Sequence, residues 1–485
     1  MDMSNLEHTD SSGRLARTKV VATIGPASEG IIGELIDAGL RTARINFSHG
    51  EPDEHRRRVD NIRRIADERG LGIGILADIQ GPKLRLGTFP GGKRALHVGE
   101  YLILIEGSGE AKPGEAFLNI PGFAATIDVG HCVYLADGQC ELVVESVQSG
   151  VAKARVLRGG WIGDRKGVHL PDTDLAIRLP TPKDVADIAL AREMEVDMIG
   201  VSFVGSGADL RAIRKVAPQP LLVAKIERSA ALINLEGILE ETDGIMVARG
   251  DLGVETPLEK LPLIQKDLIE MALKAGKFTI TATEMLESMV VAARPTRAEV
   301  ADVANAVLDG TDAVMLSAET AVGAHPILAV KAMQEIALAM ESSERYAKAT
   351  RVAFHEAEPS FSNGTALAAV QASKALSIQH IVCFTETGNT ACQVSRFRPG
   401  AAVIALTPHR RTFQALSVMG HVRPVLFERR DNLETMLTDG SQLLVDMGIC
   451  TTGEQVVMVA GVPPGIARTT NVMKLHHIGE VSSLY

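Results

Sequence analysis

The feature that most constrains the fold of this chain is a regular alternation of short apolar runs with helical stretches. Eight runs typical of buried parallel strands lie at residues 19–24, 42–45, 74–77, 198–201, 221–224, 244–247, 278–280 and 313–316. The helical stretches between them include 54–68, 183–194, 261–274 and 297–308. This pattern favours a (β/α)8 barrel, an α/β fold. An open doubly wound sheet is the alternative, but no Gly-x-Gly-x-x-Gly turn follows the first strand to support it.

The alternation is interrupted once and then resumes on a smaller scale. Residues 86–181 are rich in Gly and in short apolar runs separated by turn signals, which predicts a small β-barrel domain inserted after the third strand. Shorter alternation at the end of the chain, with strands at 381–384, 402–406, 423–426 and 455–460, predicts a separate C-terminal α/β domain. The expected organisation is a flexible N-terminal arm over 1–16, a barrel over 17–85 and 182–356, an inserted lid over 86–181, and a C-terminal domain over 357–485.

Charge and composition exclude several classes of function. The formal net charge of −10 and the absence of a basic stripe argue against nucleic-acid binding. No apolar run approaches the roughly 18 residues that a membrane helix needs. The five cysteines form no Cys-x-x-Cys pair and no signal peptide is recognised, so we expect reduced thiols in a cytoplasmic protein.

Charged residues follow two consecutive strands directly. Lys225 and Glu227 end the fifth strand, and Asp251 ends the sixth within a Gly-rich turn. In a (β/α)8 barrel, catalytic and binding residues lie at the C-terminal ends of the strands. Two carboxylates and a lysine at such ends could hold a divalent metal against an anionic substrate. A salt bridge that merely caps the two strands is the alternative. Most other strand ends are also polar, which favours a charge-rich pocket over capping; they carry Arg44, Asn46, Ser48, Asp78, Gln80, Lys83, Arg85, Thr283, Glu284, Ser317, Glu319 and Thr320.

Several long motifs resemble those of the pyruvate kinase family, in the family's order. They lie at residues 18–28, 44–50, 225–227, 248–253, 295–300 and 302–310, and they cover the predicted barrel. The resemblance implies transfer of phosphate from phosphoenolpyruvate to ADP, giving pyruvate and ATP in glycolysis through an enolate.

The resemblance also implies roles for individual residues. Glu227 and Asp251 would be ligands of Mg²⁺ or Mn²⁺. Lys225 would lie beside the transferred phosphoryl group and help stabilise the enolate, and Arg44 would clamp the transferred phosphate. The backbone amides of Gly250 and Asp251 and the Thr283 hydroxyl would bind the substrate carboxylate, while Thr283 and Ser317 would hold the water that protonates the enolate. The expected nucleotide contacts are Arg44, His49, Arg85 and Lys166, the last from a lid that excludes water.

The chain departs from the family at a monovalent-cation site. Many members hold K⁺ with an Asn, a Ser, an Asp and a Thr, and have a Glu a few residues downstream. Asn46, Ser48 and Asp78 are retained, but Ile79 stands at the Thr position and Lys83 at the Glu position. A lysine ammonium would supply the positive charge of K⁺ and repel the ion, so the sequence predicts activity without K⁺.

A second departure lies in the C-terminal domain. Where members regulated by fructose 1,6-bisphosphate have a Thr-Lys-Ser-Gly-Arg-Ser-like loop, this chain has Thr385, Glu386, Thr387, Gly388, Asn389 and Thr390. The loss of two cations and the gain of one anion predict weak binding of the bisphosphate. A monophosphate such as AMP or a sugar monophosphate is the favoured effector, with no effector at all as the alternative.

Two other functions are compatible with parts of the pattern. A metal-dependent pyruvate aldolase or lyase would also stabilise an enolate on a Glu and an Asp, but it has no need of Arg44, the lid or the C-terminal domain. A non-catalytic metabolite-binding homologue would normally have lost the metal carboxylates or the lysine, yet Lys225, Glu227, Asp251 and Thr283 are all present. By resemblance we expect a homotetramer.

Overall fold

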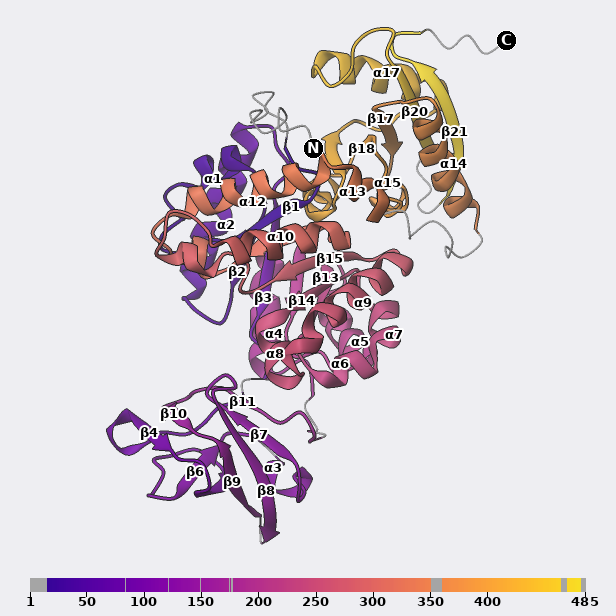
Figure 1. The fold of residues 1–485 in the computed structure, drawn as a ribbon. Helices are drawn as coiled ribbons and strands as arrows, with labels where there is room; N and C mark the ends of the chain where they lie inside the picture. Colours follow the sequence, from indigo (N-terminus) through magenta and orange to yellow (C-terminus); the bar gives the residue numbers. More distant parts are fainter. Residues whose placement is uncertain are drawn as a thin grey trace. The chain divides into compact units, whose positions relative to one another are not determined.

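The computed structural model describes residues 15–82, 84–120, 122–148, 150–173, 175, 178–349, 360–463 and 469–480 (Figure 1). Lys83 and most of the predicted N-terminal arm lie outside these ranges. The chain divides into two compact units, one with residues up to 77, 194–199 and from 266 onward, and the other with residues 78–193 and 200–265.

Eight parallel strands close into a barrel, as predicted, with the order β1-β16-β15-β14-β13-β12-β3-β2. Each strand occupies the run expected of it, and the open-sheet alternative is wrong. Every residue of β3, β14 and β15 is buried, as expected of parallel strands covered on both faces. The barrel strands are β1 (Lys19–Thr23), β2 (Leu40–Asn46), β3 (Gly74–Ile79), β12 (Met198–Val201), β13 (Leu221–Ile226), β14 (Gly244–Ala248), β15 (Phe278–Ala282) and β16 (Ala313–Leu316).

Helices connect the barrel strands, and local signals set their ends. In α10, the Thr296 side chain accepts a hydrogen bond from the Glu299 amide at the N-terminus, and Gly310 ends the helix with φ +92°. None of the helices in the described part of the chain is long and apolar enough to span a membrane. The helices are α1 (Ile32–Ala38), α2 (Pro52–Glu68), α4 (Pro182–Glu193), α5 (Gly207–Val216), α6 (Ser229–Ile233), α7 (Leu235–Glu241), α8 (Arg249–Glu255), α9 (Leu261–Lys274), α10 (Arg297–Asp309), α11 (Ala318–Ala321), α12 (Pro326–Glu341) and α13 (Glu344–Ala349).

The insertion after β3 is rich in strands, as predicted. Its strands form a six-stranded sheet and a two-stranded ribbon, and one hydrophobic core takes residues from both, including Leu104 and Ile162. The elements are β4 (Lys93–Leu96), β5 (Tyr101–Glu106), β6 (Glu115–Leu118), α3 (Phe123–Thr126), β7 (Cys132–Leu135), β8 (Cys140–Gln148), β9 (Val151–Arg158), β10 (Gly160–Gly163) and β11 (Val168–His169).

The C-terminal domain is a five-stranded sheet with the order β19-β18-β17-β20-β21. The four predicted strands are present, and the fifth, β21, pairs antiparallel to β20 at the edge. Helix α14 packs along β20 and β21 (Figure 1). The elements are α14 (Phe361–Ala375), β17 (His380–Phe384), α15 (Asn389–Ser395), β18 (Ala402–Thr407), α16 (Arg410–Ala415), β19 (Val422–Leu426), α17 (Leu433–Asp446), β20 (Gln455–Gly461) and β21 (Thr470–His477).

A buried ion pair ties the C-terminal domain to the strands of its own unit. The Arg398 Nη1 atom lies 2.8 Å from Asp312 Oδ1, and the two side chains are only 1% and 5% exposed. The other Asp312 oxygen accepts a hydrogen bond of 2.9 Å from the Thr279 amide in β15. Asp312 directly precedes β16, so this one carboxylate joins the starts of β15 and β16 to the C-terminal domain.

Candidate active site

Lys225 is the centre of a buried charge cluster at the end of β13. Its Nζ atom lies 2.8 Å from Glu227 Oε1 and 3.2 Å from Asp78 Oδ1. The lysine side chain is 12% exposed and each carboxylate side chain is 2% exposed. A charge buried in this way is stable only when it is paired, so the cluster holds one ammonium between two carboxylates. The pairing of Lys225 with Asp78 was not predicted.

The end of β12 also contributes to this cluster, a contribution that the sequence reasoning missed. The Lys225 ammonium donates a hydrogen bond of 2.8 Å to Ser202 Oγ, which in turn donates to the Ile79 carbonyl at 2.8 Å. Ser202 is the first residue after β12. The sequence signal that could have identified Ser202 is a hydroxyl directly after an apolar run, the same pattern that marks the other strand ends.

Glu227 is held by the backbone as well as by Lys225. The Phe203 amide donates a hydrogen bond of 2.8 Å to Glu227 Oε2, and Phe203 has a φ of +60°, which is uncommon for a bulky residue. Burial raises the pKa of Glu227 above its ordinary value; the Lys225 charge opposes this rise and the Asp251 charge adds to it. Asp251 lies in the first turn of α8, with Gly250 beside it.

The Glu227 and Asp251 carboxylates fit a divalent cation. The negative charge of Asp251 disfavours the ionised form of Glu227, so each carboxylate is within electrostatic reach of the other. A cation bound between them would relieve that repulsion. Carboxylate oxygens are the ligands that Mg²⁺ and Mn²⁺ prefer.

Arg44 extends from β2 and is fixed by the neighbouring strand. Its Nη1 atom donates a hydrogen bond of 2.9 Å to Thr23 Oγ1 in β1, and the Thr23 hydroxyl donates to the Leu316 carbonyl at 3.0 Å. The arginine is therefore held at the C-terminal ends of β1, β2 and β16.

The loop after β15 has a strained backbone at the predicted substrate residue. Thr283 has a φ of +68° and Glu284 a φ of +53°, a conformation that is especially unfavourable for β-branched Thr283. The Thr283 hydroxyl donates to the Ala282 carbonyl at 2.6 Å. Strain of this kind persists only where the surroundings impose it, and it often marks a functional site.

A buried carboxylate fixes the loops after β15 and β16 together. Glu319 is 1% exposed, and its two oxygens accept hydrogen bonds from the Leu286 amide at 3.1 Å and the Ser317 amide at 2.7 Å. Glu319 thus positions the backbone of Ser317. Although it was noted among the polar strand ends, nothing in the sequence indicated this bridging contact.

The residues of the predicted monovalent-cation site lie at two strand ends. Asn46 ends β2, and its side-chain oxygen accepts a hydrogen bond of 3.0 Å from the Ser48 amide. Asp78 belongs to the Lys225 cluster, and the Ile79 side chain is buried. The counterpart of the lost glutamate, Lys83, falls outside the described residues.

The predicted nucleotide contacts lie in separate loops. Arg85 Nη1 donates to the Arg165 carbonyl at 2.5 Å, so it is engaged within the lid connection. Lys166 is exposed and lies 3.9 Å from Asp137. His49 is exposed in the loop after β2.

The predicted effector loop follows β17 and leads into α15. The Thr385 hydroxyl accepts from the Gly388 amide at 2.9 Å, and Thr390 shares a hydrogen bond of 2.8 Å with Thr470. Thr387 is exposed, and Asn389 begins α15.

Glu386, at the position of a family lysine, is paired with two basic side chains. Arg429 reaches its two oxygens at 3.1 and 2.5 Å, and His409 Nε2 lies 2.7 Å from Oε2. Burial alone would raise the pKa of Glu386, but the hydrogen bonds from Arg429 and His409 outweigh it and hold the pKa below its ordinary value. The Arg429 cation next to the loop is thus neutralised by the protein itself.

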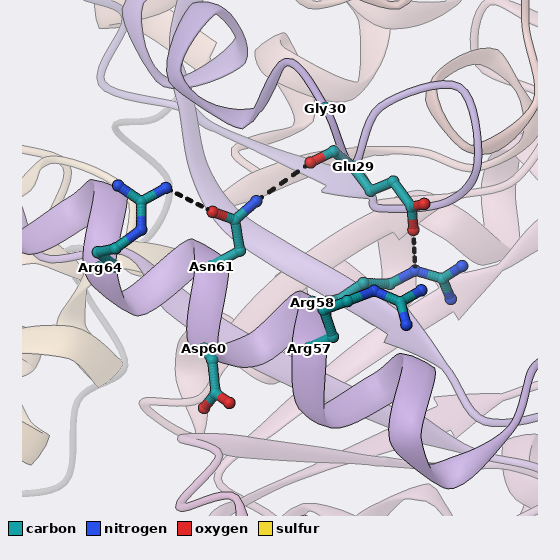
Figure 2. A pocket seen from close by; sticks show the side chains of 7 residues that line it. All are labelled: Glu29, Gly30, Arg57, Arg58, Asp60, Asn61 and Arg64. Atoms are coloured by element: carbon teal, nitrogen blue, oxygen red, sulfur yellow. Dashed lines mark hydrogen bonds and ion pairs between the residues drawn. The ribbon is translucent and has the colours of Figure 1, made fainter.

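A surface pocket is lined by α2 and by the turn after β1 (Figure 2). Arg58 Nε contacts Glu29 at 2.9 Å, and Asn61 donates to the Glu29 carbonyl at 3.2 Å while accepting from Arg64 at 2.7 Å. These contacts fasten α2 to the turn after β1. The pocket contains none of the predicted site residues; it is lined by Glu29, Gly30, Arg57, Arg58, Asp60, Asn61 and Arg64.

Comparison with known proteins gives a consistent result over both parts of the chain. The family model for the pyruvate kinase barrel domain matches residues 15–330, and that for the pyruvate kinase alpha/beta domain matches residues 363–476. A pyruvate kinase from Methylorubrum extorquens is 42% identical over 465 residues, which cover 95% of this chain and 97% of that protein. One from Staphylococcus haemolyticus is 39% identical over 475 residues, covering 96% of this chain and 81% of that protein.

A solved structure agrees with these sequence relatives. The crystal structure of a pyruvate kinase from Cryptosporidium parvum superposes with a TM-score of 0.89 at 32% identity and covers 96% of each chain. With barrel, insertion and C-terminal domain all matched, this chain belongs to the pyruvate kinase family of phosphotransferases.

Proposed function

We propose that this protein makes pyruvate and ATP from phosphoenolpyruvate and ADP, as a step of glycolysis, at the strand ends that carry Lys225, Glu227 and Asp251. The family uses these substrates and requires a divalent metal. The observation that carries the proposal is the cluster itself, because it places one ammonium against the buried carboxylates Asp78 and Glu227 at strand ends. A salt bridge that only capped a strand would need Lys225 and one carboxylate. Here a second carboxylate and the Ser202 hydroxyl also bind the ammonium, and Phe203, which binds Glu227, has a strained backbone.

Glu227 and Asp251 are the residues that would hold the divalent metal, Mg²⁺ or Mn²⁺. When bound, the metal supplies Lewis-acid stabilisation of negative charge on a substrate oxygen. The Phe203 amide binds one oxygen of the Glu227 carboxylate and Lys225 the other, so that the ligand keeps its orientation.

Lys225 stabilises the negative charge that develops as the phosphoryl group leaves and the enolate forms. Its ammonium is oriented before substrate binds, by Glu227, Asp78 and Ser202. A charge oriented in advance needs no reorganisation during the reaction, which is the most effective form of electrostatic catalysis.

The other strand ends bind and orient the substrates. Arg44, held by Thr23, is a planar, permanently charged clamp for the transferred phosphate. The amides of Gly250 and Asp251 and the Thr283 hydroxyl bind the substrate carboxylate. Thr283 and Ser317 hold the water that delivers a proton to the enolate carbon, with Glu319 fixing the Ser317 backbone.

One assay tests the function and its cation requirements together. We expect pyruvate formation by the purified protein to require ADP and a divalent metal, and to proceed in Na⁺ or tetramethylammonium buffer without added K⁺. The physical reason is that Lys83 stands in the sequence at the position of the family glutamate and would supply the positive charge of K⁺, while the Ile79 side chain offers no oxygen ligand.

The arms of this assay have separate outcomes. Lactate-dehydrogenase-coupled rates are measured with ADP, Mg²⁺ or K⁺ omitted one at a time. ADP-independent release of pyruvate would favour the aldolase or lyase alternative, and no turnover under any condition would favour the non-catalytic one. Strong activation by K⁺ would contradict the cation proposal alone and leave the phosphotransfer intact.

The C-terminal loop is proposed to bind a monophosphate effector rather than fructose 1,6-bisphosphate. Glu386 neutralises Arg429 and holds the His409 ring, so a doubly phosphorylated sugar would find these two basic side chains already engaged. At subsaturating phosphoenolpyruvate we expect little activation by the bisphosphate, and activation by AMP or a sugar monophosphate. Replacing Glu386 by Gln removes the negative charge that neutralises Arg429 and is expected to increase the response to the bisphosphate, with Glu434→Gln as the matched control. Strong wild-type activation by fructose 1,6-bisphosphate would refute the proposal.

We also propose a homotetramer, by analogy with the family.

A further inference from the structure

A nitrogen, a sulfur and an oxygen ligand converge at one edge of the C-terminal sheet. His380 is the first residue of β17, Glu454 immediately precedes β20, and Cys450 lies in the turn between α17 and β20. Because β17 and β20 are neighbouring parallel strands, their first residues meet at the same edge. The His380 ring nitrogen, the Cys450 sulfur and a Glu454 oxygen all lie within 4.8 Å of one another.

The spacing of these atoms suits a small divalent ion. A tetrahedral zinc ion with ligands at about 2.0–2.3 Å holds its donor atoms roughly 3.3–3.7 Å apart. The His380 Nδ1 atom lies 2.6 Å from Glu454 Oε1, so metal binding would lengthen this distance slightly. It would also shorten the distances from the Cys450 sulfur to these two atoms slightly. Both are side-chain adjustments and require no movement of the strands.

The backbone around two of the three ligands is already fixed. Glu454 Oε2 accepts a hydrogen bond of 2.9 Å from the Thr451 amide, which leaves Oε1 directed at His380. The Glu454 carbonyl accepts from the Ile478 amide at 2.9 Å, and the Cys450 amide donates to the Leu444 carbonyl at 3.2 Å. Such outer contacts orient metal ligands and strengthen their binding.

A hydrogen bond between His380 and Glu454 does not by itself bring a third donor atom to this pair. Cys450 is 3% exposed and packs in the hydrophobic core of the C-terminal domain, and its sulfur also lies within 4.8 Å of the ligand atoms of His380 and Glu454. In the described part of the chain, this is the one group of three such residues with ligand spacing.

We propose that His380, Cys450 and Glu454 form a binding site for Zn²⁺ or a similar borderline-soft divalent ion, separate from the two-carboxylate site at Glu227 and Asp251. Three protein ligands leave the fourth position to water. The mixed nitrogen, sulfur and oxygen set selects zinc or cobalt over Mg²⁺, which prefers oxygen alone. The ion joins β17, β20 and the turn after α17, and so clamps that edge of the C-terminal domain.

Cobalt titration of the full-length protein tests this proposal. Co²⁺ is added to metal-stripped protein in excess Mg²⁺, which fills the oxygen site. We expect one equivalent of Co²⁺ to bind with a thiolate-to-cobalt charge-transfer absorption in the near ultraviolet, and Zn²⁺ to displace it. Cys450→Ser should abolish this absorption, His380→Gln should weaken Co²⁺ binding at least tenfold, and the matched control Cys392→Ser should behave like wild type.

The charge-transfer absorption requires a sulfur ligand, so cobalt bound by Glu227 and Asp251 cannot produce it. The readout is therefore independent of catalytic activity. Absence of the absorption in the wild-type protein would overturn the proposal, even if the variants fail to fold. Its persistence in Cys450→Ser, or its loss in Cys392→Ser, would overturn it as well.

Discussion

Lys225→Met is expected to lower kcat for phosphoryl transfer by about 10²–10³-fold, the usual effect of removing one oriented group that stabilises transition-state charge. The ammonium is oriented by Glu227 and Asp78 before substrate binds, so its loss removes stabilisation that no other group of the cluster supplies. The apparent affinity for the divalent metal should not fall, because both proposed metal carboxylates remain and one of them loses its competing ammonium.

The same substitution has a second, independent signature. It leaves the buried carboxylates of Asp78 and Glu227 without their ammonium, and losing one partner of a buried pair costs about 3–5 kcal/mol. We therefore expect a lower Tm in the metal-free protein and a larger rise in Tm on adding Mg²⁺ than in wild type. The control is Lys215→Met, since Lys215 is exposed at the end of α5. Turnover like that of wild type in Lys225→Met would contradict the assigned role.

Glu227→Gln is expected to produce the complementary defect. Losing a residue that only supports a metal ligand lowers metal affinity by about 10–100-fold. Losing the charged ligand itself should cost more, so the Mg²⁺ concentration for half-maximal activity should rise by more than about 10–100-fold. The amide can still accept the hydrogen bond from the Phe203 amide, so the local backbone should be kept.

Coupled assays across a Mg²⁺ or Mn²⁺ titration measure this effect, with Glu241→Gln as the matched control because Glu241 pairs with Arg211 near the surface. If half-maximal activity in Glu227→Gln needs no more metal than in wild type, Glu227 is not a ligand. Lys225→Met and Glu227→Gln together separate the two roles, since one changes turnover at saturating metal and the other changes the metal requirement.

The barrel could be predicted because its strands are continuous apolar runs that end in polar residues. Strand β14 illustrates this: five buried residues lead directly into Arg249 and Asp251. The edge strand β21 could not be found in the same way, because a strand at the edge of a sheet has mixed burial and no continuous apolar run. Its position depends on pairing with β20, which is a tertiary property.

The site was predictable as a set of strand ends but not as a set of contacts. Spacing indicated that Lys225 and Glu227 share a strand end, whereas the contact of Lys225 with Asp78 depends on the strand order, which places β3 and β13 on either side of β12. The positive φ of Thr283 also has no sequence signal, since a β-branched residue ordinarily avoids that conformation. Likewise, the loss of a lysine at Glu386 was evident from the sequence, but its pairing with Arg429 and His409 was not.

Strands β15 and β16 are restrained at both of their ends. Asp312 anchors their starts to Arg398, and Glu319 joins the loops that follow them. The two strands are therefore held to each other both where they begin and where they end, and Arg398 contacts the same pair of strands that leads to Thr283 and Ser317. Since the family has an effector-binding C-terminal domain, these two carboxylates would connect such a domain to the predicted substrate residues.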